Sequence, residues 1–243
     1  MEEALSGGNM DPVVRSGDTV RRVAGPWTEA VHALLDVLQA SGVAGAPRAL
    51  GLDERGREVL TYLPGDVLAD APPDVQWSEN ALHDAGRLLR RIHDASVELV
   101  GAGDLAWRSP RREPAEVICH NDFANYNLIV RDGVLVGVID FDFAGPGSRV
   151  WDLAYLAYRL VPFAEDAADA VALDRGHRLQ ALIDAYGVAY APQDVLAVAA
   201  DRLDDLAEFT RGRAADTGRR DFLDHADMYD RNAAHLRQRA AHR

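Results

Sequence analysis

Short apolar and β-branched runs dominate the first sixty residues and alternate with turn signals. Val13–Arg15 and Thr19–Val23 are β-prone runs separated by Gly17-Asp18, a pattern that predicts a β-hairpin. Ala49–Leu52 and Glu58–Leu63 flank a polar turn that contains a glycine, which indicates a second hairpin. The N-terminal region is therefore expected to consist mainly of strands.

One helix is expected between the two hairpins. Thr28 can cap its N-terminus, and Ser41-Gly42 supplies its end. Between these residues the apolar positions follow the i, i+3, i+4, i+7 spacing of an amphipathic helix, namely Val31, Leu34, Leu35 and Leu38.

After residue 63 the pattern changes from strands to helices. Tyr62-Leu63-Pro64-Gly65 opens a stretch rich in proline and aspartate. We place a boundary here, between an N-terminal lobe of residues 1–63 and a larger C-terminal lobe of residues 64–243. The next helix is expected to be capped by Ser78, and its apolar stripe is Leu82, Ala85, Leu89 and Ile92.

A third hairpin is expected inside the helical region, after the short apolar run Val117–Cys119. Asn127–Val130 and Val134–Ile139 flank the turn signal Asp132-Gly133. A two-residue turn pairs residue 131 with residue 134, so Asn127 should face Val138. The rest of the chain predicts four helices, at about 150–161, 165–186, 192–211 and 218–240. Strands with one helix, followed by helices with one hairpin, indicate an α+β fold in two unequal lobes.

Composition restricts the class of protein. The 243 residues are 48% apolar and 27% charged, which is ordinary for a folded globular chain. The net charge of −13 disfavours nucleic acid and anionic membranes as partners and favours cations, either metals or polyamine-like substrates. A single cysteine excludes an internal disulfide and any zinc site built from several cysteines. All the basic side chains other than histidine are arginine, because the chain contains no lysine.

The sequence predicts a cytoplasmic protein. No run of 18 apolar residues is present to span a membrane. The opening residues MEEALSGGNM are acidic and lack the basic and apolar regions of a secretory signal.

Three polar side chains are expected to meet at one end of the third hairpin. Asp140 lies two residues beyond Val138, on the face that Asn127 shares, and Asp122 lies in a loop that can fold back over that end. Amide and carboxylate oxygens suit Mg²⁺. A further carboxylate can accept a proton from an attacking hydroxyl. These are the parts of phosphoryl transfer as kinases perform it.

The same segment resembles the aminoglycoside phosphotransferase/choline kinase-like family, relatives of the protein kinases. The family's pattern is His-Gly-Asp, four residues, Asn, and then an apolar residue, Asp and an aromatic residue. Here residues 120–127 read HNDFANYN and residues 138–156 read VIDFDFAGPGSRVWDLAYL. The resemblance is very specific over about 117–157 and looser through the N-terminal lobe. It implies a two-lobed protein kinase-like fold, with a small β-rich N-lobe that binds nucleotide and a larger, mostly helical C-lobe.

The resemblance implies a role for each matching residue. Asp122 matches the catalytic base, and His120 matches a position that supports the catalytic loop rather than reacting. Asn127 and Asp140 match the Mg²⁺ ligands. Asp142 is close enough in sequence to assist the metal or a second one.

The resemblance also implies a nucleotide site in the N-lobe. Gly7, Gly8 and Asn9, with the preceding serine, look like a short loop whose backbone N–H groups would cradle phosphates. The backbone of Tyr62 and Leu63 would meet adenine at the hinge between the lobes. ATP and Mg²⁺ are the implied cofactors.

Two departures from the family pattern concern the same site. The family's phosphate-contacting lysine is missing, and Arg22 is the best positional match, with Arg21 second. In the family this lysine pairs with a helix residue, usually glutamate. Here the candidates for that partner are Glu29 and His32, and the sequence does not decide between them. Asn121 replaces the usual glycine beside the catalytic aspartate.

Three functions fit these observations. The first is an ATP- and Mg²⁺-dependent O-phosphotransferase that acts on a hydroxylated small molecule, such as an aminoglycoside-like antibiotic or another natural product. The net charge favours a cationic acceptor. The second is a non-enzymatic immunity or binding protein on the same scaffold, because the lysine is missing and the N-terminal lobe resembles short, trifolitoxin-immunity-like family members. The third is a metabolite kinase of the choline or homoserine type.

Overall fold

The computed structural model describes residues 2–5, 13–103, 105–165, 167 and 173–241. The chain divides into two compact units. The first unit combines Met1–Gln76 with Leu88–Arg149, and the second combines Trp77–Arg87 with Val150–Arg243. The first unit thus contains both the N-terminal strands and the segment around residues 120–142. The lobe boundary expected between residues 63 and 64 stays a prediction.

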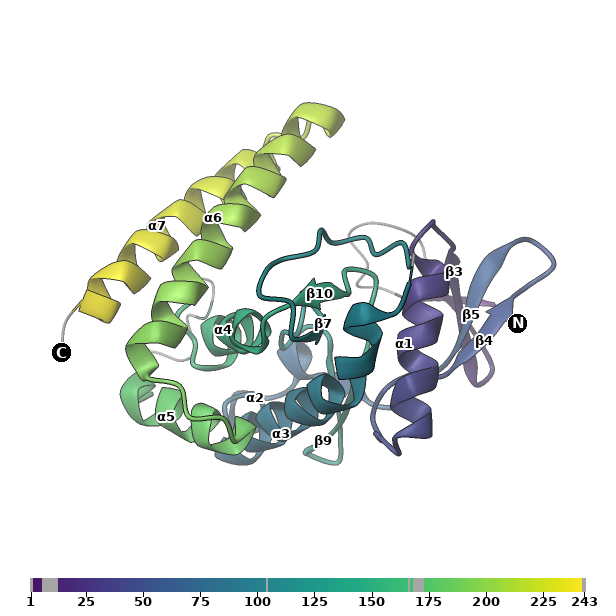
Figure 1. The fold of residues 1–243 in the computed structure, drawn as a ribbon, viewed down its shortest axis with the longest axis horizontal. Helices are drawn as coiled ribbons and strands as arrows, with labels where there is room; N and C mark the ends of the chain where they lie inside the picture. The colour runs from purple at the N-terminus through teal and green to yellow at the C-terminus, as the bar shows by residue number, and fades with distance from the viewer. Residues whose placement is uncertain (1, 6–12, 104, 166, 168–172, 242–243) are drawn as a thin grey trace. The chain divides into compact units, whose positions relative to one another are not determined.

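The first unit begins with an antiparallel sheet of five strands in the order β1-β2-β3-β5-β4 (Figure 1). Its strands are β1 (Glu3–Leu5), β2 (Val13–Ser16), β3 (Thr19–Val23), β4 (Ala49–Leu52) and β5 (Arg57–Thr61). The two predicted N-terminal hairpins are therefore confirmed. The pairing of β3 with β5 sets Arg22 directly opposite Glu58, which joins residues 36 positions apart in the sequence.

Helix α1 (Thr28–Ala40) runs alongside this sheet and buries the predicted apolar stripe (Figure 1). The expectation that Thr28 caps the helix is wrong. Trp27 is the N-cap, and Thr28 is the first helical residue, whose hydroxyl accepts a bond from the Gly25 N–H at 2.9 Å. The helix ends as expected at Ser41, and Gly42 follows with the left-handed φ of 70° that favours glycine.

Shorter elements complete the first unit. They are β6 (Asp66–Val67), η1 (Leu68–Asp70), α2 (Pro73–Gln76), η2 (Val97–Gly101), β7 (Val117–Cys119), β8 (Leu128–Arg131), β9 (Val134–Val138) and β10 (Gly145–Gly147). One sheet has the order β6-β8-β9, and β10 pairs with β7 in another. The sequence did not predict β6 and β10, because two residues and a Gly-Pro-Gly segment lack a strand's alternating pattern.

The hairpin of β8 and β9 forms at the expected turn, where Asp132 and Gly133 both have positive φ. Its predicted register is wrong beyond the first two pairs. The pairing is irregular between Ile129 and Val130, where Val136 is an extra residue on the opposite strand. Leu128 rather than Asn127 therefore lies opposite Val138. Gly45 packs against the strand at this point, and its carbonyl accepts a bond from the Val138 N–H at 2.8 Å.

The only cysteine of the sequence lies in β7, and its side chain is fully buried. The Cys119 thiol donates to the Ser148 carbonyl at 3.3 Å. A Cβ added to Gly147, on the paired strand β10, would lie only 3.0 Å from Sγ. The sulfur is therefore packed tightly against backbone atoms.

Helix α3 (Glu79–Ser96) begins in the second unit, where the Ser78 hydroxyl accepts from the Ala81 N–H at 3.1 Å, as expected of a cap. Helix α4 (Arg149–Leu160) follows the expected bounds closely. Helix α5 (Arg175–Tyr186) begins ten residues later than predicted, because Asp174 is its N-cap and accepts from the His177 N–H at 3.0 Å. The predicted helix also included residues 165–174. Of these, the structure describes residues 165, 167, 173 and 174, and none of the four is helical.

Helices α6 (Pro192–Thr217) and α7 (Asp221–Ala241) form a long antiparallel hairpin at the end of the chain (Figure 1). Gly218, at φ 70°, ends α6. Arg237 of α7 bridges Asp201 and Asp204 of α6, which ties the two helices together at their surface. In the described part of the chain, no helix combines the length and the apolar character needed to cross a membrane.

Candidate active site

The loop between β7 and β8 fixes the Asp122 carboxylate through both of its oxygens. The Tyr126 hydroxyl donates to Oδ1 at 2.5 Å. The Asn127 amide donates from Nδ2 to Oδ2 and to the Asp122 carbonyl, both at 2.9 Å. Donors on each oxygen hold the carboxylate in one orientation.

These bonds also orient the buried Asn127 side chain. Both acceptors are oxygens, so the amide group that faces them must be the nitrogen. The backbone of Asn127 is bonded as well, since its carbonyl accepts from the Ile139 N–H at 2.9 Å. The amide oxygen of Asn127 accepts no hydrogen bond from the described residues, so it is the atom that can bind a cation.

His120 is fully buried and bonded on both ring nitrogens. Its Nδ1 accepts from the Asp122 N–H at 3.2 Å, and Nε2 donates to the Ile139 carbonyl at 3.0 Å. This pattern requires a neutral ring that carries its proton on Nε2. Phe123 and Phe141 lie against the ring, with centroids at 5.5 and 4.6 Å. His120 therefore links the loop to the end of the hairpin.

Asn121 has a left-handed backbone, with φ of 62°. Glycine adopts this conformation most easily, and asparagine tolerates it better than most residues. The Asn121 amide donates to the Phe143 carbonyl at 2.9 Å. Asparagine therefore meets the same backbone requirement as the family's glycine and adds one hydrogen bond.

Asp140 also has a left-handed backbone, with φ of 65°, just after β9 ends. Because of the register shift, simple strand alternation no longer places Asp140 on the face of Asn127, as the sequence had suggested. The left-handed residue turns the chain here, and Oδ1 accepts from Arg22 Nη1 at 2.9 Å. The Asp140 side chain keeps 46% of its surface exposed, so it can still reach a ligand from solvent.

Arg22, the predicted substitute for the missing lysine, is buried and bonded to three carboxylates. Its Nε donates to Glu58, Nη1 to Asp140, and Nη2 forms an ion pair with Asp142 at 2.6 Å. Burial by itself lowers the pKa of this guanidinium, but attraction to the three carboxylates outweighs burial, and the pKa is raised. The site therefore has a permanent positive charge at its base.

The helix partner expected for Arg22 was Glu29 or His32, and the structure corrects this expectation. The buried carboxylate bonded to Nε belongs to Glu58 of β5, on the neighbouring strand. His32 of α1 bonds to the other oxygen of Glu58 at 2.9 Å. The helix thus supports Arg22 through Glu58. The sequence missed Glu58 because the pairing of β3 with β5 joins segments that no local turn connects.

A second arginine, Arg108, was also missed. Its guanidinium lies over the rings of Trp27 and Phe143, at 4.2 and 4.5 Å from their centroids, and Nη1 donates to Asp142 at 3.3 Å. Asp142 therefore lies between two arginines. Burial raises the pKa of the Asp142 carboxyl above its ordinary value, since attraction to Arg22 only partly offsets the loss of water. Arg108 stands in an irregular segment with no pattern to mark it.

The predicted nucleotide contacts are placed in part. Gly7, Gly8 and Asn9 lie outside the described residues. The Tyr62 N–H donates to the Asp18 carbonyl at 2.8 Å, so it is already used, and its ring lies beneath Arg15. Leu63 follows the end of β5 and is half-buried.

The donors at the end of the hairpin fit a magnesium ion. The Asn127 amide supplies an oxygen, and Asp140 supplies a carboxylate that is nearly half exposed. Hard oxygen donors of this kind, together with water and substrate phosphates, are what Mg²⁺ binds in proteins.

Comparison with known proteins gives a consistent result. The model of a family described as "Phosphotransferase enzyme family" matches residues 20–113 and 103–192. The trifolitoxin immunity protein of Rhizobium leguminosarum bv. trifolii is 36% identical over 198 residues, which span 77% of this chain and 74% of that protein.

Solved structures share the fold at low identity. A choline/ethanolamine kinase family protein from Mesorhizobium loti superposes with a TM-score of 0.65 at 19% identity, covering 99% of this chain and 90% of that one. An amicoumacin kinase in complex with AMP-PNP, Ca²⁺ and Ami superposes with a TM-score of 0.69 at 13% identity, covering 98% of this chain and 88% of that one.

Proposed function

This chain belongs to the phosphotransferase enzyme family, and from that premise we propose that it transfers a phosphoryl group from ATP to a hydroxyl of a small molecule. The observation that carries the proposal is the Asp122 carboxylate, which Tyr126 and Asn127 hold through both oxygens. A carboxylate fixed in this way can orient an acceptor hydroxyl and take its proton. In phosphoryl transfer the protein acts mainly by positioning and by charge.

His120 is proposed as a positioning residue. It is fully buried between aromatic rings, and both of its nitrogens are bonded to backbone groups. It therefore fixes the Asp122 backbone relative to Ile139 and takes no proton from the substrate.

Asn127 and Asp140 are the proposed ligands of Mg²⁺, and Asp142 contacts both arginines. The ion would neutralise charge on the transferred phosphoryl group. Arg22 contributes positive charge beside it. Nε and Nη1 of its planar guanidinium already donate to Glu58 and Asp140, whereas Nη2 forms an ion pair with Asp142 but has no hydrogen-bond partner among the described residues, so a phosphate would have to compete with these carboxylates.

Adenine is proposed to lie against the backbone at Leu63, since the Tyr62 N–H is bonded within the protein. Gly7, Gly8 and Asn9 remain the residues proposed to cover the phosphates.

The acidic chain favours a cationic acceptor, in keeping with an aminoglycoside-like compound. A cytoplasmic location follows from the same assignment, since ATP is the donor.

The test is phosphoryl transfer from radiolabelled ATP to a panel of acceptors that includes aminoglycosides, choline and homoserine. Asp122→Asn keeps the shape of the side chain and removes the base, so turnover should fall by about 10²–10⁴-fold. Asp132→Asn is the matched control, because it makes the same change of charge at the turn of the same hairpin, where asparagine also tolerates the positive φ.

Full turnover in Asp122→Asn, with unchanged product, would refute the assignment of the base. Loss of turnover in the Asp132→Asn control would show that the effect of Asp122→Asn does not come from the base.

A second function is favoured by one observation, the 36% identity with the trifolitoxin immunity protein. In this alternative the chain protects a cell by binding a toxic compound. Calorimetry with ATP and Mg²⁺ separates the two functions. The phosphotransferase proposal requires nucleotide binding at millimolar concentration, whereas a simple binder would protect cells equally well with Asp122→Asn.

A further inference from the structure

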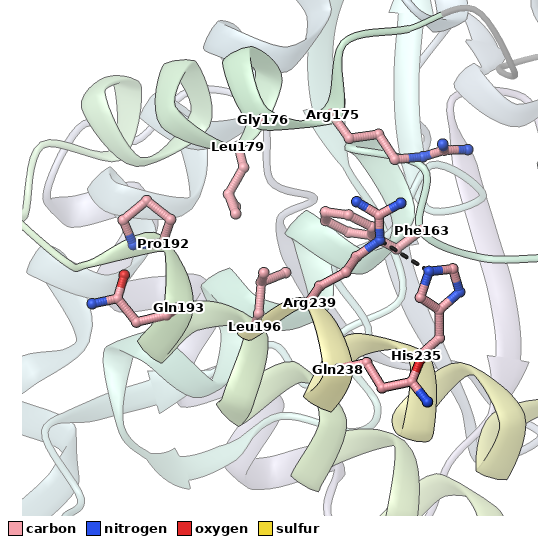
Figure 2. A pocket seen from close by; sticks show the side chains of 10 residues that line it. All are labelled: Phe163, Arg175, Gly176, Leu179, Pro192, Gln193, Leu196, His235, Gln238 and Arg239. Atoms are coloured by element: carbon pink, nitrogen blue, oxygen red, sulfur yellow. Dashed lines mark hydrogen bonds between the residues drawn. The ribbon is translucent and has the colours of Figure 1, made fainter. Parts of the chain in front are cut away.

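The second unit contains a cavity of about 640 Å³ that the phosphotransferase proposal does not use (Figure 2). It is lined by the first turns of α5 and α6 and by the last turns of α7. Its volume falls within the usual range for small-molecule sites. All the lining residues belong to the second unit.

The cavity has a basic end and an apolar end. Figure 2 shows Arg175, Arg239 and His235 gathered on one side, and Leu179 and Leu196 further along the cavity. Both leucines are buried, at 3% and 8% exposure. This separation of charge from apolar surface fits a ligand that carries one anionic group on a hydrocarbon body.

Each of the two arginines is held by one hydrogen bond from Nε, which leaves the N–H groups of its terminal nitrogens for a ligand. Arg175 donates from Nε to the Pro162 carbonyl at 2.9 Å, and Arg239 donates from Nε to His235 Nε2 at 3.0 Å. Each guanidinium is thus held by Nε, and its two terminal nitrogens form no ion pair with any described residue. Four other arginines of this helical region do have acidic partners, namely Arg211, Arg219, Arg231 and Arg237. In a chain of net charge −13, two arginines at one cavity that have no acidic partner among the described residues are a specific local feature.

From this arrangement we infer that the cavity binds an aliphatic carboxylate. The terminal nitrogens of an arginine match the two oxygens of a carboxylate. The hydrocarbon body would pack against the small part of Leu179 and Leu196 that faces the cavity, which a bare inorganic anion would not cover. The site is independent of the proposed phosphotransferase function, because its residues take no part in that reaction.

The experiment is calorimetry of the full chain with octanoate, without nucleotide or metal. We expect saturable one-to-one binding. Acetate has the charge without the chain, and octanol has the chain without the charge, so each should bind at least about tenfold more weakly. Failure of octanoate to saturate at millimolar concentration overturns the proposal, and equal binding of octanol overturns the requirement for an anion.

Three variants locate the binding. Arg239→Gln should weaken octanoate by about tenfold, whereas Arg219→Gln, an equal change of charge outside the cavity, should leave it unchanged. Gly176→Leu should abolish binding by filling the cavity. An added Cβ at Gly176 meets only Asp174 Oδ1, at 3.4 Å, and leucine suits a helix better than glycine, so folding should persist. Wild-type affinity in both Arg239→Gln and Gly176→Leu would show that octanoate binds elsewhere.

Discussion

Two residues of the candidate site, Asn121 and Asp140, have φ values of 62° and 65°. This left-handed region costs most L-residues about 1–2 kcal/mol, while short polar side chains tolerate it better. Both residues also use their side chains, since Asn121 donates to Phe143 and Asp140 accepts from Arg22. The sharp turns that shape the site are therefore built from residues that serve in its bonding.

Asn121 gives a prediction about stability. Asn121→Ala should lower the free energy of unfolding by about 1–3 kcal/mol, because alanine loses the hydrogen bond and is strained at positive φ. Asn121→Gly loses the same bond without the strain, so it should be the milder change. Urea unfolding of both variants measures the difference. Equal or greater loss in the glycine variant would contradict the role given to backbone conformation.

Apart from Arg22, the contacts found from sequence alone join residues that lie within a short motif. Asp122 and Asn127 are five positions apart, and their bond follows from one loop. Glu58 and Arg108 were missed because they reach the site through sheet pairing and an irregular segment. No local pattern reports which carboxylate or arginine a distant strand or loop will bring to the site.

Among the helices, the N-termini of α5 and α6 differ in one respect. Asp174 caps α5 through its side chain, whereas Ala191 precedes α6 and offers no side-chain acceptor. Ala191 nevertheless has the extended backbone of a capping residue, with φ of −72° and ψ of 135°. The 26-residue helix α6 therefore begins without a side-chain capping bond, although the backbone at residue 191 would allow one.

The two caps predict changes of opposite sign. Ala191→Ser should raise the free energy of unfolding by about 0.5–1 kcal/mol, and Asp174→Ala should lower it by about 1 kcal/mol. Thermal unfolding of the two variants beside the wild type provides the measurement. If serine at position 191 gave no gain, another group would have to satisfy the first N–H groups of α6.

At the level of elements, the sequence predicted most helices and hairpins and failed where a distant contact intervened. The turn at Asp132 and Gly133 was predicted by local chemistry. The register beyond it was not, because β9 contains one extra residue, Val136, at the place where Gly45 packs against the strand. The start of α5 was misplaced because the capping residue Asp174 was not recognised.

For the whole molecule, the expected α+β, two-lobed kinase-like fold is confirmed. At the candidate site the carboxylates of Glu58, Asp140 and Asp142 each form an ion pair with Arg22, and Asp142 also contacts Arg108. The sequence reported the total charge but not this pairing, which depends on the folded chain.

These ion pairs make a prediction about metal removal. A chelator should leave the unfolding temperature of the wild type unchanged. Arg22→Gln should lower the free energy of unfolding by roughly 3–5 kcal/mol, because the buried carboxylates of Glu58 and Asp142 then lose the cation that they share. Magnesium at millimolar concentration should restore part of this loss and stabilise the variant more than the wild type.

The control is Arg57→Gln, which breaks exposed ion pairs in the same sheet and should be insensitive to magnesium. A wild-type chain that melts earlier in chelator, or an Arg22→Gln variant that does not respond to magnesium, would contradict the role given to these ion pairs.

The buried sulfur of Cys119 gives the molecule an internal reporter. Cys119 is fully buried and packed against Gly147 and Ser148, so a thiol reagent can react only after the structure around β7 opens. Because the sequence has no other cysteine, the rate of a colorimetric disulfide exchange would measure how often this region opens under native conditions. Saturating nucleotide should slow that rate if ligand binding stabilises the neighbouring catalytic loop, and the measurement needs neither a label nor a mutation.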